Sequence, residues 1–195
     1  MTNPLHVVRS ELLLGGQKSG KSRRALELAM AWLQGAPGHR AVVLATAVAR
    51  DAEMHTRILR HQRERLQLEP RLTTIEEPRD LAAAIAQHSR PDTLLVVDCL
   101  TLWLTNLLWP EGLPHDGVEL PDVEPETERL LGALQHAPGP LVLVSNEIGL
   151  GVIPMGQSTR AFVDALGVLN QQVAGACQRV CFMAGGLPLV LKALL

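Results

Sequence analysis

The stretch Leu12-Leu13-Leu14-Gly15-Gly16-Gln17-Lys18-Ser19-Gly20-Lys21-Ser22 decides the fold of this chain. It joins an apolar run to a helix-forming stretch through a glycine-rich segment ending in Lys-Ser, which is the pattern of a phosphate-binding loop in its strand, loop and helix setting. Glycines let the backbone curl so that successive N–H groups point inward, while Lys21 can reach the outer phosphates and Ser22 can ligate Mg²⁺. The pattern predicts that residues 15–22 bind a nucleoside triphosphate.

Short apolar runs alternate with helical patterns along the rest of the 195-residue chain. This alternation predicts an α/β fold with a mostly parallel central sheet. Most runs are continuously apolar, as expected for strands covered by helices on both faces. We therefore predict a P-loop NTPase fold of the RecA-like type, formed by residues 1–195 as one domain. The expected strands are Glu11–Leu14, Ala41–Ala47, Thr93–Asp98, Leu141–Ser145, Val180–Met183 and Leu187–Lys192, and the expected helices are Lys21–Gln34, Asp51–Leu68, Pro78–Gln87, Leu100–Leu108, Glu126–His136 and Thr159–Cys177.

Composition and charge narrow the choice of partners. Hydrophobic residues make up 47% of the chain and charged residues 19%, which suffices for a sizeable core. A formal net charge of −2 favours neither nucleic acid nor an anionic membrane as partner. The richest apolar stretch is interrupted by Asp98, Asn106 and Pro110, so we expect no membrane insertion. The three cysteines lack CxxC spacing, which argues against a disulfide framework or a zinc site and favours the reducing cytoplasm: Cys99, Cys177 and Cys181.

A proline-rich segment separates two of the expected helices. Pro110, Pro114, Pro121 and Pro125 occur there among acidic residues. Proline removes backbone donors and breaks helices, so this segment cannot be regular structure. We expect a surface loop in this position.

Asp98 is the second candidate for the nucleotide site. It ends the apolar run Leu94-Leu95-Val96-Val97, and ligands of open α/β sheets bind at the carboxyl ends of strands. Beside a phosphate loop, its carboxylate could hold Mg²⁺ together with Ser22. The competing interpretation is that Asp98 caps the helix beginning near Leu100. We favour the metal or nucleotide role, because the phosphate loop creates the need for it.

Two further positions leave alternatives open. The segment Asn146-Glu147-Ile148-Gly149 stands where a classical GTPase has Asn-Lys-x-Asp, so a switch-type GTPase is not expected. Glu147 could position a nucleophile or acceptor, or it could simply form a loop. The helical spacing of Met54, Ile58 and His61 gathers them on one face. By the residues alone, a histidine among arginines is more often part of a solvated helix than a catalytic group.

The ordered motifs of nearly the whole chain resemble those of bifunctional adenosylcobinamide kinase/adenosylcobinamide-phosphate guanylyltransferases. The matching segments are Gly15–Ser22, Ala45-Thr46-Ala47, Asp51–Met54 leading to Arg60-His61, Asp98–Thr101 with Trp103 and Asn106, Ser145–Pro154, the residues Arg160, Phe162, Asp164, Gly167, Asn170 and Gln171, and Gly186-Leu187-Pro188 with Lys192. Several motifs in one order are far more specific than a phosphate loop alone.

The resemblance implies two reactions. Adenosylcobinamide would be phosphorylated with GTP or ATP, and GMP from GTP would then be transferred to that phosphate through a guanylylated histidine, matching His61. Lys21 would serve the triphosphate in both reactions. The implied nucleotide pocket also includes Ala45, Thr46, Ala47, Gln62, Arg63, Glu64, Arg65, Glu76 and Asp98. The family further implies a homo-oligomer, with a trimer as one option.

Two other classes stay open. A monofunctional P-loop small-molecule kinase would use the same loop and Asp98 without needing His61. A nucleotide-regulated binding module would bind GTP and turn over nothing. The density of matched motifs makes the binding module the least favoured.

Overall fold

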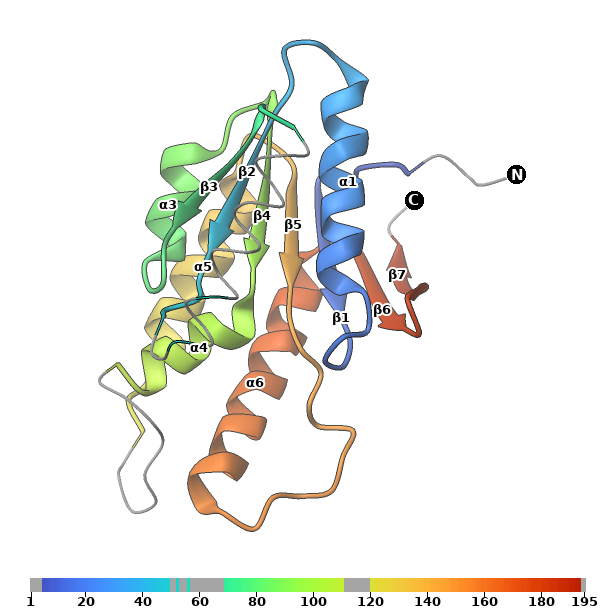
Figure 1. Ribbon diagram of the computed structural model, residues 1–195. Coiled ribbons are helices and arrows are strands. Elements are labelled where there is room, and N and C mark those ends of the chain that lie inside the picture. The colour runs from blue at the N-terminus through green and yellow to red at the C-terminus, as the bar shows by residue number, and fades with distance from the viewer. Residues whose placement is uncertain (1–4, 50–51, 53–55, 57–68, 111–119, 194–195) are drawn as a thin grey trace.

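The computed structural model describes residues 5–49, 52, 56, 69–110 and 120–193, and Figure 1 shows their arrangement. Within these ranges seven strands form one sheet in the order β3-β2-β4-β5-β1-β6-β7. The neighbouring strands are parallel, apart from the antiparallel pair β6 and β7. The bounds are β1 (Ser10–Leu14), β2 (Arg40–Ala45), β3 (Leu72–Glu76), β4 (Thr93–Asp98), β5 (Leu141–Val144), β6 (Arg179–Ala184) and β7 (Leu187–Ala193).

Helices cover both faces of the sheet, as the apolar strands predict (Figure 1). One face packs against α1 (Lys21–Gly35), and Leu13 of β1 belongs to that core. Leu12 and Leu14 point the other way, because successive strand residues alternate between faces. The helices on that second face are α3 (Leu81–His88), α4 (Leu100–Leu108), α5 (Glu124–His136) and α6 (Gln157–Ala176). This is the mostly parallel α/β architecture expected from the sequence.

Strand β3 was not predicted from the sequence. Its five residues, Leu-Thr-Thr-Ile-Glu, lack a continuous apolar run, and only Leu72 is buried. Strand β3 lies at the edge of the sheet and pairs with one strand only, so it is less buried and its hydrophobic pattern is weak. The expected strand to Ala47 was also too long, since β2 ends at Ala45. Helix α5 begins two residues earlier than expected, with Pro125 inside its first turn, where a missing N–H costs nothing.

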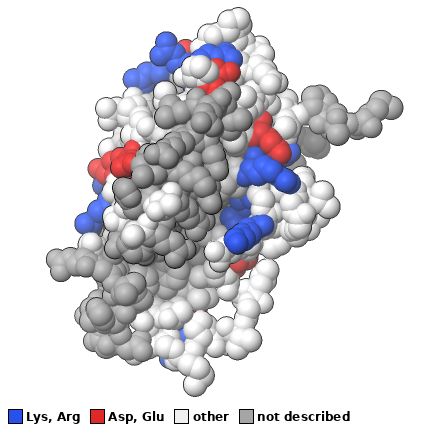
Figure 2. Space-filling view, in the orientation of Figure 1, with Lys and Arg blue, Asp and Glu red and all other residues white. Residues whose placement is uncertain are grey.

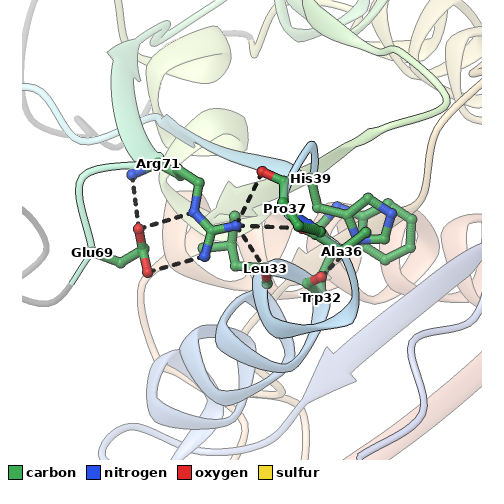
Figure 3. Close-up of polar contacts among 7 residues, drawn as sticks. All are labelled: Trp32, Leu33, Ala36, Pro37, His39, Glu69 and Arg71. Atoms are coloured by element: carbon green, nitrogen blue, oxygen red, sulfur yellow. Dashed lines mark hydrogen bonds and ion pairs between the residues drawn. The ribbon is translucent and has the colours of Figure 1, made fainter.

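At the amino ends of the strands, Arg71 closes the end of α1. Figure 3 shows its guanidinium between the Glu69 carboxylate, with Nε 3.1 Å from Oε1, and the carbonyls of Leu33 at 2.9 Å and Ala36 at 3.3 Å. These carbonyls lack partners inside the helix, so the cation satisfies them and complements the helix dipole. Beside them the His39 ring stacks on Trp32, with ring centroids 3.9 Å apart.

Three other expectations meet the structure here. The three cysteines, for which no disulfide was expected, are free and buried. No helix of the described ranges is long and apolar enough to cross a bilayer. The expected helix 51–68 lies outside the described residues, except for the helical residues Ala52 and Thr56.

Candidate nucleotide site

The phosphate loop between β1 and α1 can be built only with glycine at two positions. Gly15 has φ 144°, and a Cβ placed there would lie 2.4 Å from the carbonyl oxygen of Met183. Gly20 has φ 103°, and its Cβ would lie 3.1 Å from Cα of Gly186. Residues with a Cβ atom rarely adopt φ angles in this range. The loop therefore takes its shape from close contact with β6 and the β6–β7 turn, which the Gly186 N–H strengthens by donating to the Ser19 carbonyl at 3.0 Å.

Helix α1 presents an uncapped amino end to this loop. Gly20 is the N-cap residue and provides no side-chain cap, and the first turn contains no acidic residue. The first N–H groups of a helix have no partners within it, and the helix dipole adds positive potential there. Ser22 is exposed in the same turn. This end of α1 can therefore bind a phosphate group.

Lys21 lies buried at the start of α1. Its Nζ donates to the carbonyl oxygens of Gly15 at 2.8 Å and Gly16 at 2.7 Å. Burial lowers the pKa of Lys21, and the neighbouring Cys99 and Asp98 oppose that shift through their charge. Its ammonium is thus held against the loop backbone and near the Asp98 carboxylate. An ammonium group at this position can stabilise the negative charge of a bound phosphate.

Three of the predicted pocket residues meet at the carboxyl edge of the sheet. Ala45 at the end of β2 is in register with Glu76 of β3 on one side and with Asp98 of β4 on the other. The sequence positions alone do not indicate that these residues are neighbours, because Ala45 and Asp98 lie 53 positions apart in the chain. The N-cap of α4 is Cys99, which makes no side-chain cap. Asp98 therefore lies one residue before the N-cap position of α4.

Thr46 forms hydrogen bonds to the backbone that connects β4 to α4. Its hydroxyl donates to the Cys99 carbonyl at 2.8 Å and accepts from the Cys99 N–H at 2.9 Å, while its own N–H donates to the Asp98 carbonyl at 3.1 Å. Asn106 of α4 donates from Nδ2 to the Thr46 carbonyl at 2.8 Å. These bonds fix the backbone that carries Asp98. Thr46 is fully buried, so its hydroxyl acts on the protein backbone.

A second set of polar side chains fixes the turn after β5, and the sequence alone gave them no role. The Asn146 N–H donates to the Thr101 hydroxyl at 2.8 Å, and Asn170 Nδ2 donates to the Asn146 carbonyl at 3.0 Å. The next N–H, of Glu147, donates to the Gly15 carbonyl at 3.1 Å. Thr101 and Asn170 are buried on otherwise apolar helix faces. A polar residue at a buried position of a helix needs a hydrogen-bond partner. The positions of Thr101 and Asn170 could therefore have indicated that their side chains bond to another segment.

The Glu147 carboxylate accepts a hydrogen bond from the Gly149 N–H at 2.8 Å. This bond supports the loop-forming alternative for Glu147. Its backbone contact with Gly15 also places Glu147 beside the phosphate loop.

The oxygen donors expected for Mg²⁺ fit that ion. Ser22 offers an exposed hydroxyl and Asp98 a carboxylate near Lys21, and Mg²⁺ prefers oxygen ligands shared with substrate phosphates and water. No cluster of three His, Cys, Asp or Glu residues that could hold a metal occurs among the described residues. Five predicted site residues lie outside the described ranges: His61, Gln62, Arg63, Glu64 and Arg65.

This site occurs in a chain with named relatives. Residues 11–191 match the family described as cobinamide kinase / cobinamide phosphate guanyltransferase. The chain belongs to this family. Family membership makes it an enzyme, with the kinase and nucleotidyltransferase activities of cobalamin biosynthesis that the family description names.

Similar proteins extend over almost the same length. The chain is 44% identical over 182 residues to the bifunctional adenosylcobalamin biosynthesis protein CobP of Pseudomonas aeruginosa, covering 93% of this chain and 96% of that protein. It is 31% identical over 187 residues to the bifunctional adenosylcobalamin biosynthesis protein CobU of Escherichia coli, covering 93% and 98%. The flagellar accessory protein FlaH of Methanocaldococcus jannaschii superposes with a TM-score of 0.51 at 12% identity, covering 95% of this chain and 78% of FlaH. The last likeness concerns the fold alone.

Proposed function

We propose that this enzyme carries out both family reactions at the phosphate loop. It phosphorylates adenosylcobinamide with GTP or ATP, then transfers GMP from GTP to that phosphate, giving adenosylcobinamide-GDP. The observation that carries the proposal is the meeting of the phosphate loop, buried Lys21 and the edge of Glu76, Ala45 and Asp98 in a chain of this family.

In the first reaction, the aminopropanol hydroxyl of the corrinoid attacks the γ-phosphorus. The bond from that phosphorus to the bridging oxygen breaks, the nucleoside diphosphate leaves, and the hydroxyl proton passes to a base or to water. Phosphoryl transfer asks a protein mainly for positioning and charge compensation. The N–H groups at the start of α1 hold the phosphates, and Lys21 offsets charge on the leaving group.

In the second reaction, we propose His61 as the nucleophile. A neutral imidazole nitrogen attacks the α-phosphorus of GTP, and pyrophosphate leaves with the bridging oxygen. The corrinoid phosphate then attacks the same phosphorus, the P–N bond breaks, and the histidine is restored. Covalent catalysis thereby divides one difficult displacement into two easier ones. Gln62, Arg63, Glu64 and Arg65 belong to the same proposal.

Four further expectations complete the proposal. Mg²⁺, held by Ser22 and Asp98, would neutralise charge on the triphosphate. A homo-oligomer, with a trimer as one option, is supported by the last strand of the described sheet, β7, which exposes Leu187, Leu189, Val190 and Leu191. A cytoplasmic location is supported by three free buried thiols. The charge distribution favours no nucleic-acid partner: on the face in Figure 2, basic and acidic groups of the described residues are interspersed.

Incubation with α-labelled GTP tests the histidine route. We expect the wild-type protein to retain label that mild acid removes and alkali does not, as for a phosphoramidate. His61→Ala should lose both the label and guanylyl transfer, yet retain GTP-dependent phosphorylation of adenosylcobinamide. An acid-labile adduct on the His61→Ala protein would place the nucleophile elsewhere. A wild-type protein that phosphorylates the corrinoid but never takes label would be a monofunctional kinase.

A further inference from the structure

Four large apolar side chains stand exposed on the loop between β5 and α6. Leu150 is 78% exposed, Val152 96%, Ile153 77% and Met155 95%. We call these four residues the apolar rim. In Figure 1 this loop extends from the carboxyl end of β5 to the start of α6. Four exposed large apolar side chains so close together in one loop are typical of a binding surface.

Hydrogen bonds at both ends connect the rim to the rest of the molecule. At its start, the Glu147 N–H donates to the phosphate-loop carbonyl of Gly15 at 3.1 Å. At its end, Arg160 of α6 donates from Nη1 to the carbonyl of Pro154 at 3.0 Å and also to that of Met155. The segment that carries the rim is thus bonded to the phosphate loop through Glu147, three residues before Leu150, and the rim side chains are exposed to solvent.

We infer that the apolar rim binds the corrin ring of the substrate during both reactions. This inference rests on the proposed function. The reacting hydroxyl ends a short arm on a macrocycle far larger than a phosphate group. When that hydroxyl reaches a nucleotide on the loop, the ring must therefore lie on a surface next to the loop. The rim is such a surface.

The chemistry of the rim agrees with this ligand. Residues 148–156 contain no charged side chain. The corrin ring carries methyl groups on its faces and uncharged amide arms at its edge, so it can bury apolar area without needing a cation. A nucleotide in the same place would leave its phosphates without a partner from these residues.

A second copy of the chain is the competing occupant. Strand β7 suits that partner better, because it combines exposed apolar side chains with the last position in the sheet, where backbone groups can pair with another strand. The rim lies in a loop without strand structure. We therefore assign self-association to β7 and the corrin ring to the rim.

The test replaces Val152 and Ile153 with serine in the full-length enzyme, and the matched control is Val168→Ser, at a 51% exposed valine of α6. We expect the KM for adenosylcobinamide in the kinase reaction to rise roughly tenfold or more, from the lost apolar contact of two side chains. The Kd for a fluorescent GTP analogue and the molar mass in solution should stay at wild-type values. Val168→Ser should change none of the three.

An unchanged KM for the corrinoid would overturn the inference, and so would a fall in molar mass accompanied by parallel loss of nucleotide binding. If the double variant does not fold, Met155→Ser carries the same test at a position 95% exposed. Failure of the wild-type enzyme to phosphorylate adenosylcobinamide would instead refute the proposed function itself.

Discussion

The two ends of the central sheet are built on opposite principles. At the amino ends of the strands, the last carbonyls of α1 accept from Arg71, and Gly139 fits against backbone, with its N–H donating to the Ser89 hydroxyl at 3.1 Å. At the carboxyl ends, α1 begins without a side-chain cap, and the phosphate-loop glycines Gly15 and Gly20 adopt positive φ. One end satisfies its own polar groups, and the other leaves donors for a ligand.

This difference predicts that substitutions at the two ends of the sheet affect different properties of the enzyme. Both ends contain a glycine that a side chain would force into backbone, Gly15 at one and Gly139 at the other. Changes at the carboxyl end should therefore reduce catalysis, while changes at the amino end should reduce stability and spare the activity of folded molecules. Five substitutions test this comparison.

Lys21→Ala should have the largest effect on catalysis. Both activities lose the ammonium that compensates triphosphate charge, so we expect kcat/KM to fall about 100- to 1,000-fold for each. Because burial lowers the pKa of Lys21, the ammonium is lost at lower pH than for an ordinary lysine, and wild-type activity should fall at a correspondingly lower alkaline pH. Residual activity of Lys21→Arg, which keeps its charge, should lack that alkaline fall. Near-normal turnover by Lys21→Ala at saturating GTP and Mg²⁺ would remove the loop from the mechanism.

Gly15→Ala should come next. Its Cβ would lie 2.4 Å from the Met183 carbonyl oxygen, so the loop must shift, and such a displacement can cost about 100-fold in rate. Gly16→Ala is the matched control, since a Cβ there meets nothing within 4 Å. Equal activities for the two variants would show that the loop shape is not what matters.

Asp98→Asn should weaken both reactions by about tenfold, mainly by raising the Mg²⁺ concentration needed for half-maximal activity. Asparagine is nearly isosteric, and the backbone around it is held by Thr46, so thermal unfolding should stay close to wild type. An unchanged Mg²⁺ requirement would exclude Asp98 from metal binding.

Gly139→Ala should act on stability instead. Its Cβ would lie 2.0 Å from the Arg90 carbonyl oxygen, and overpacking of this kind costs roughly 1–3 kcal/mol of unfolding free energy. The activity per folded molecule should stay at the wild-type level. Denaturant unfolding and active-site titration measure the two quantities separately, and a loss of intrinsic activity would contradict the division between the sheet ends.

Arg71→Ala should give the smallest effect, again on stability alone. Its hydrogen bonds lower the pKa of Glu69, so this contribution is present above the ordinary carboxyl range and disappears as the pH falls through the lowered value. The variant should therefore be less stable than wild type at neutral pH, and the gap should narrow in acid. A gap that stays constant across this range would mean that Arg71 acts through its contacts with α1 and not through Glu69.

Much of the fold could be predicted because its signals are local. Continuous apolar runs indicate buried parallel strands, and Gly15–Ser22 between strand and helix indicates the phosphate loop whatever surrounds it. Burial raises the pKa of Cys99 to about 11, an effect that no local pattern could indicate.

The sequence by itself determined the kind of sheet, the phosphate loop and, through ordered motifs, the family. Only the tertiary structure decided that β3 exists, that Glu76, Ala45 and Asp98 lie in register, and that Glu147 contacts Gly15. The physical reason is that sheet register and loop contacts join residues far apart in the chain. An edge strand such as β3 is stabilised by its pairing with the neighbouring strand. Its own five residues therefore need not show a recognisable strand pattern.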